Sequence, residues 1–156
     1  MDIRFAERKD CALILTFIRA LADYEKMPDD VVATSELLEE WLFDKQKAEV
    51  IFALEDGKEV GFALFFHNFS TFLGRAGIYL EDLFVLPEHR GKGYGKGLLT
   101  ELAKLTVQRG CGRLEWSCLD WNKPSIDFYL SMGAKPMDGW TVYRITGERL
   151  QELGKQ

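Results

Sequence analysis

The stretch from Tyr79 to Leu99 constrains the fold of this chain more than any other. Its first half, Tyr79 to Leu86, is mostly apolar and predicts a strand covered on both faces of a sheet. A turn rich in glycine and positive charge follows, and the leucines after it predict a core-facing helix. A strand, a glycine turn and a helix in this order are typical of a backbone site for phosphate, because the N–H groups at a helix N-terminus point toward the anion.

Glycine-rich turns occur in several nucleotide-binding motifs, and two of these do not fit the chain. No Gly-Lys-Ser/Thr follows at the P-loop interval, and no window matches G-x-G-x-x-G. What remains is Arg90-x-x-Gly93-x-Gly95, in which the glycines let backbone N–H groups approach a pyrophosphate without a Cβ atom in the way. Arg90, Lys92 and Lys96 add positive charge for the outer phosphates. The pattern predicts one anionic ligand; a tight turn with solvated lysines is the alternative.

Length and charge exclude several further classes of protein. The chain has 156 residues and a net charge of −5, which fits one domain over residues 1–156 and argues against nucleic-acid binding. No apolar run approaches the roughly 20 residues of a membrane helix, and the charged N-terminus lacks the apolar centre of a secretory signal. We therefore expect a cytoplasmic protein without membrane partners. Cys11, Cys111 and Cys118 form no C-x-x-C pair, so we expect neither a disulfide framework nor a metal site.

Hydrophobic periodicity predicts an α/β fold. Strands are expected over residues 3–6, 49–54, 59–69, 76–86 and 113–119. Helices are expected from Asp10 to the loop at residues 24–30, over 34–42, from the glycine turn to Gly110, and over 122–133. A final hairpin is expected over residues 134–138 and 140–145, followed by a short polar tail. The order is neither strictly alternating nor all-β, so the natural architecture is a mixed sheet with an antiparallel N-terminal part.

Several segments together resemble one family. Arg90 to Gly95, preceded by Leu83 to His89, is similar to the acetyl-CoA motif of the GNAT superfamily of N-acetyltransferases. Tyr79 to Val85 and Trp121 to Tyr129 resemble its spermidine/spermine and thialysine acetyltransferase branch, and Asp138-Gly139-Trp140 falls where that branch has an acidic-Gly-Trp turn. The resemblance implies a GNAT-type fold: a mixed, largely antiparallel central sheet flanked by helices, with a V-shaped opening between the two central strands. It also implies a homodimer.

The resemblance further implies how acetyl-CoA is bound, as a co-substrate and without a metal. Backbone amides between Lys92 and Lys96 would bind the pyrophosphate, and the strand around Phe84 and Val85 would pair with the pantetheine arm. Tyr129 matches the position at which the family protonates the departing thiolate. The full set of expected coenzyme contacts is Leu83, Phe84, Val85, Arg90, Gly91, Lys92, Gly93, Tyr94, Gly95, Lys96, Asn122, Ser125 and Tyr129.

The chemistry of acetyl transfer requires residues of these types. An alkylamine has a pKa of about 10.4 and must lose a proton before it attacks. Glu81 is the candidate base, acting through a water, although an ordinary strand glutamate paired with a basic residue is the alternative. Tyr129, with a reference pKa of about 10, is neutral at pH 7 and can donate a proton to a thiolate. A backbone N–H between Phe84 and Leu86 is the expected donor to the oxyanion.

The expected substrate is a small cationic amine, acetylated directly on a primary amino group. Glu81, Asp82, Asp29, Asp30 and Asp138 would form an acidic pocket for its positive charges, and Trp140 would wall the pocket or bind a cation on its face. The loop carries Pro28-Asp29-Asp30 where the eukaryotic polyamine enzymes have paired glutamates, so a polyamine, thialysine or another diamine stays open. The rival functions are a protein or peptide N-acetyltransferase and a non-catalytic acyl-CoA-binding module.

Overall fold

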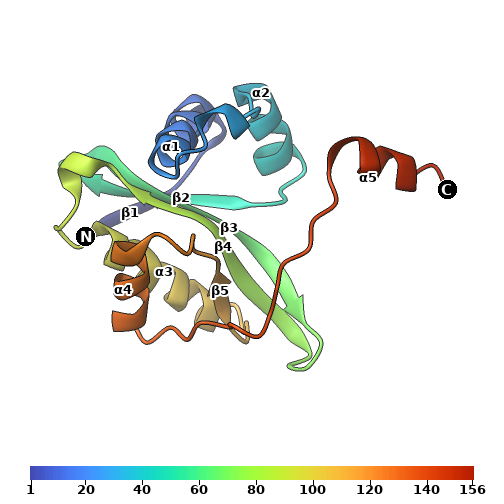
Figure 1. Ribbon diagram of the computed structural model, residues 1–156. Coiled ribbons are helices and arrows are strands. Elements are labelled where there is room, and N and C mark those ends of the chain that lie inside the picture. The colour runs from blue at the N-terminus through green and yellow to red at the C-terminus, as the bar shows by residue number, and fades with distance from the viewer. The chain divides into compact units, whose positions relative to one another are not determined.

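The computed structural model describes all 156 residues and groups them into two compact units, Met1–Leu119 and Asp120–Gln156. The first unit contains a single sheet of five strands in the order β1-β2-β3-β4-β5 (Figure 1). The strands are β1 (Asp2–Phe5), β2 (Glu49–Glu55), β3 (Lys58–Ser70), β4 (Arg75–Val85) and β5 (Leu114–Trp116). The pairs β1–β2, β2–β3 and β3–β4 are antiparallel and β4–β5 is parallel, so the expected mixed, largely antiparallel sheet is confirmed.

Helices cover both faces of this sheet, with α1 and α2 on one face and α3 on the other (Figure 1). The helical segments of this unit are, in chain order, η1 (Arg8–Asp10), α1 (Cys11–Tyr24), η2 (Pro28–Asp30), α2 (Ser35–Leu38), η3 (Glu39–Asp44), η4 (Pro87–His89) and α3 (Tyr94–Gln108). Ile14 and Phe17 of α1 pack with Phe52, Phe62 and Phe84 of the sheet in one buried cluster. The apolar face of α1, from which the helix was predicted, is therefore the face that packs into the core. None of the helices combines the length and the apolar composition that crossing a bilayer requires.

The pairing of β4 with its two neighbouring strands is irregular near the C-terminal end of β4. On the β3 side, Leu64 pairs with Asp82 and Phe65 with Leu80, so Glu81 is an extra residue in a β-bulge. On the β5 side, the parallel ladder begins at Ile78 and ends at Leu80, so the rest of β4 has no strand beside it there. This end of the β4–β5 ladder is the opening that the fold class implies. The backbone of β4 beyond Leu80 is thereby left available on that edge.

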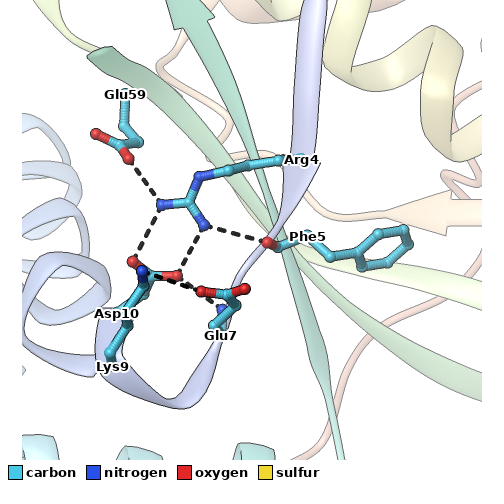
Figure 2. A network of polar contacts seen from close by, with 6 residues as sticks. All are labelled: Arg4, Phe5, Glu7, Lys9, Asp10 and Glu59. Carbon is cyan, nitrogen blue, oxygen red and sulfur yellow. Dashed lines mark hydrogen bonds and ion pairs between the residues drawn. The ribbon is translucent and has the colours of Figure 1, made fainter. Parts of the chain in front are cut away.

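A polar network joins β1, the start of α1 and β3 (Figure 2). The guanidinium of Arg4 donates to both carboxylate oxygens of Asp10, at 2.8 and 3.0 Å, and to Glu59 at 2.7 Å. Asp10 also accepts the backbone N–H of Glu7 at 2.7 Å. The hydrogen bond from Arg4 holds the pKa of the buried Asp10 carboxyl below its usual range, as it does for Glu59. The network fixes the first helix against the sheet.

We expect Asp10→Asn to lower the free energy of unfolding at pH 7 by about 1–3 kcal/mol, because Arg4 then loses its buried partner charge. A carboxyl whose pKa is lowered by folding stabilises the protein above its unfolded pKa, and this contribution disappears as the pH falls through the lowered value. The difference from wild type should therefore shrink between pH 5 and pH 2. Urea unfolding across this range measures it, with the exposed Asp23→Asn as control. A difference that stayed constant with pH would contradict the ion-pair account.

The second unit contains α4 (Lys123–Ser131) and α5 (Gly147–Leu153). Asn122 caps α4 by accepting the N–H of Ser125, and Gly133 ends the segment with a left-handed φ of +90°. The final hairpin predicted over residues 134–138 and 140–145 is wrong. The turn at Asp138–Gly139 forms, but its flanks are neither helix nor strand. Alternating apolar residues indicate a strand only if another strand supplies the hydrogen bonds, and here Trp140 and its apolar neighbours are exposed.

Candidate active site

The glycine turn presents an uncapped helix N-terminus. Gly91 and Gly93 have φ values of +79° and +88°, which other residues rarely adopt, and Gly93 is the N-cap of α3 without a side-chain cap. The first intrahelical hydrogen bond runs from the N–H of Gly97 to the carbonyl of Gly93, so the N–H groups of Tyr94, Gly95 and Lys96 precede the helical ladder. No atom lies within 4 Å of the positions that a Cβ would take at Gly91 or Gly93. These residues fit a pyrophosphate.

The three basic side chains of the turn have different surroundings. Arg90 donates from Nε to the carbonyl of Val85 at 2.9 Å, and its guanidinium carbon lies 4.9 Å from the Tyr24 ring centre and 5.0 Å from that of Phe84. Arg90 therefore attaches the turn to β4 and to the end of α1, a role that the sequence pattern did not indicate. Lys96 is exposed at the start of α3. Lys92 has an ionic partner.

That partner is Glu55, at the end of β2, which was not among the predicted site residues. Its Oε1 accepts the Tyr94 hydroxyl at 2.8 Å and the Lys92 ammonium at 3.1 Å. Its Oε2 lies 2.8 Å from Nδ1 of His89, although this nitrogen lacks the alignment of a hydrogen bond. The Tyr94 hydroxyl, and then Lys92, hold the pKa of the Glu55 carboxyl below its usual range. No local sequence signal could reveal Glu55, because it lies far from the turn along the chain.

The end of β4 carries the residues predicted to meet the pantetheine arm. Phe84 is buried in the core cluster, and Leu83 and Val85 are partly buried. Of the N–H groups considered for the oxyanion, that of Leu86 donates to the carbonyl of Val60 at 2.9 Å. Leu86 is therefore excluded as the donor. Phe84, two residues earlier and paired with Phe62 in the same antiparallel ladder, also directs its N–H toward β3, so Val85 remains.

A group of three carboxyls lies where α1 ends beside the bulge of β4. Burial, and then the charges of Glu81 and Glu25, raise the pKa of Asp82 to about 7. Burial and the charge of Glu81 likewise raise the pKa of Glu25, the C-cap residue of α1. Glu81 itself is exposed at the bulge. The structure brings Glu25 near the adjacent residues Glu81 and Asp82. Sequence reasoning missed Glu25 because it follows an unremarkable helix.

The other predicted residues are distributed over both units. Asp29 and Asp30 are exposed in η2 of the first unit. In the second unit, Asn122 is buried at the N-cap of α4 and Ser125 lies in the first turn of that helix. Tyr129 is partly buried on α4, with its ring centre 5.4 Å from that of Phe128. Asp138 and Trp140 are exposed in the segment between α4 and α5. No group of His, Cys, Asp and Glu side chains is arranged to hold a metal ion.

Comparison with known protein families places the strand, turn and helix in context. The Acetyltransferase (GNAT) family matches residues 15–134, which is most of the chain and includes the glycine turn. The chain is a GNAT acetyltransferase. It is 37% identical to a thialysine N-epsilon-acetyltransferase of Bos taurus over 163 aligned positions, covering 97% of this chain and 95% of the relative.

Two further proteins are similar to this acetyltransferase. An L-ornithine N5-acetyltransferase of Arabidopsis thaliana is 46% identical over 102 positions, covering 65% of this chain and 45% of the relative. Among solved structures, an integron cassette protein from the mobile metagenome of V. cholerae superposes with a TM-score of 0.83 at 29% identity, covering 99% of this chain and 98% of that one. The family and the GNAT-type α/β fold that the sequence predicted are thereby confirmed.

Proposed function

We propose that this GNAT acetyltransferase transfers the acetyl group of acetyl-CoA directly to a primary amine of a small cationic substrate: thialysine, a polyamine or a related diamine. The observation that carries the proposal is the pairing of two sites in the first unit. The uncapped N-terminus of α3 suits a pyrophosphate, and the carboxyls of Glu25, Glu81 and Asp82 suit an ammonium group. Similarity over nearly the full length to a thialysine acetyltransferase supports the same substrate class.

The coenzyme half of the proposal rests on the turn. The N–H groups of Tyr94, Gly95 and Lys96 would bind the pyrophosphate, with Lys92 and Lys96 supplying charge for the outer phosphates. The open edge of β4 around Phe84 and Val85 would pair with the pantetheine arm, since no strand occupies it there. Acetyl-CoA supplies the activated acetyl thioester. Asn122 and Ser125 stay candidate coenzyme contacts at the start of α4.

The amine half rests on the three carboxyls. A carboxylate attracts the ammonium form of the substrate, and the same group can take up the proton that the amine must lose. Glu81 is the exposed member at the bulge, so we assign it the proton, passed through a water molecule. Asp82, with a pKa of about 7, is neutral in acid and charged in base, so it holds a cation better as the pH rises. Asp29, Asp30, Asp138 and Trp140 stay candidates for the distal charge of the substrate.

The experiment that tests the function is a thiol-release assay with acetyl-CoA and a panel of amines. The panel contains thialysine, ornithine, lysine, spermidine, short diamines and several peptides. We expect release with one or more of the small amines and little with peptides. Release with peptides alone would make the chain a protein or peptide acetyltransferase. Coenzyme binding without release on any amine would make it a non-catalytic acyl-CoA-binding module.

We expect Glu81→Gln to lower kcat/KM for the amine and to move the acid limb of its pH profile to higher pH. Without the Glu81 carboxylate, a larger share of the reaction depends on amine that is already deprotonated in solution, and this form increases with pH. The pH dependence of kcat/KM measures this, with the exposed Glu36→Gln as control. A shift to lower pH would assign the proton to Asp82 instead, because loss of the Glu81 charge lowers the pKa of Asp82.

A homodimer is part of the same proposal. Trp140, Val142 and Ile145 are exposed by 79%, 79% and 53% in a segment that forms no strand. We take these exposed apolar side chains as part of a surface that a second copy of the chain covers. Sedimentation equilibrium should give twice the mass of one chain, 17.9 kDa, and a monomer at micromolar concentration would contradict the dimer.

A further inference from the structure

Glu55 makes contacts with three residues that lie on both sides of the glycine turn. His89 ends η4, Lys92 lies between Gly91 and Gly93, and Tyr94 is the first residue of α3. One carboxylate therefore meets the chain before, within and after the two glycines with positive φ. Glu55 itself is at the end of β2, in the hairpin that leads into β3, and so belongs to the sheet.

These contacts restrain the part of the turn that follows Arg90, whose own side chain is held at the carbonyl of Val85 and over two aromatic rings. Gly91 and Gly93 have no atom within 4 Å of their Cβ positions, so side-chain packing does not fix their backbone. Glycine also loses more conformational freedom on ordering than any other residue. A turn that is ordered before its ligand arrives binds more tightly, because the entropy of ordering is not lost at the binding step. The link from the turn to the rigid sheet through Glu55 provides this order.

We propose that Glu55 is a positioning residue that holds the glycine turn in the conformation in which its N–H groups receive the pyrophosphate of the coenzyme. The inference rests on the proposed function, since it takes acetyl-CoA as the ligand of the turn. Glu55 acts through Lys92 and Tyr94 and does not contact the phosphates. Its negative charge works against this effect, because a carboxylate near the site repels phosphate and occupies Lys92. Removal of the Glu55 side chain would weaken coenzyme binding through loss of positioning, and would strengthen it through loss of the repulsion.

The test is calorimetric titration of CoA into wild type, Glu55→Ala and Glu55→Gln. We expect Glu55→Ala to raise the dissociation constant about tenfold. We expect Glu55→Gln to have a smaller effect, because the amide oxygen still accepts the Tyr94 hydroxyl. Glu88→Ala is the matched control, since it removes an exposed glutamate near the turn that makes none of the Glu55 contacts. Unchanged or tighter binding by Glu55→Ala would overturn the proposal.

A second readout separates positioning from a general loss of structure. Acetyl-pantetheine carries the thioester but no pyrophosphate. Turnover with acetyl-CoA should show a raised KM and a nearly unchanged kcat in Glu55→Ala, whereas kcat/KM with acetyl-pantetheine should equal that of wild type. Equal losses with both thioesters would mean that Glu55 only stabilises the fold, and would also overturn the proposal. If wild type itself bound no CoA, the proposed function would fail, and the inference with it; normal binding by wild type and Glu55→Ala alike would remove the inference alone.

Discussion

Phenylalanine in place of Tyr129 is expected to lower kcat by about 100-fold or more and to leave the dissociation constant for CoA nearly unchanged. The substitution removes one hydroxyl and keeps the ring that packs beside Phe128 on α4. A neutral tyrosine can donate a proton to the departing thiolate, and phenylalanine cannot. The effect therefore belongs to the chemical step and not to binding. Steady-state kinetics combined with a CoA titration separates the two.

The control for this variant is Tyr143→Phe, which removes the same group from a tyrosine that is 91% exposed in the same unit. It should retain the turnover of wild type. If Tyr129→Phe also turned over at nearly the wild-type rate, Tyr129 would not be the acid. A large rise in the dissociation constant with unchanged kcat would instead make Tyr129 a coenzyme contact.

Valine in place of Gly93 is expected to raise the KM for acetyl-CoA by at least about tenfold. A β-branched residue is strained at a φ of +88°, at a cost of about 1–2 kcal/mol, so the backbone at the start of α3 shifts away from its N-cap geometry. The added side chain also occupies the open space beside Gly93, where the pyrophosphate is proposed to bind. Both effects disturb the N–H groups that are proposed to bind the pyrophosphate. Initial rates at varied acetyl-CoA concentration measure the change.

Gly74 offers a matched control for the strain alone. It has a φ of +69° in the β3–β4 hairpin and, like Gly93, no atom within 4 Å of its Cβ position. Gly74→Val should lose a similar amount of stability and keep the wild-type KM for acetyl-CoA. Similar KM values in both variants would show that strain, and not loss of the anion site, explains any effect at Gly93.

The local sequence pattern correctly predicted helices and turns, which form their own backbone hydrogen bonds or bury one continuous apolar face. Helical spacing located α1 and α3, and the turn signals at Gly93, Gly133 and Asp138–Gly139 correspond to backbone turns in the structure. The final hairpin failed because a strand depends on a partner that the segment does not contain. Periodicity carries no information about that partner.

The parts of the site that could not be predicted are contacts between distant segments. Glu55 meets the turn only because β2 and β3 bring the hairpin beside it, and Glu25 meets Asp82 only because α1 ends beside β4. Arg90 fits the phosphate pattern by sequence, yet its guanidinium lies over two aromatic rings and binds a backbone carbonyl. Basic residues in a motif therefore indicate an anion site, but the sequence does not show which of them contacts the ligand.

The most direct test of the central claim is a mass spectrum of the products formed from acetyl-CoA and thialysine. The account predicts thialysine carrying one acetyl group on its side-chain amine, formed in step with free CoA and lost in Tyr129→Phe. Free CoA without an acetylated small amine, or acetyl groups found only on added peptides, would contradict it.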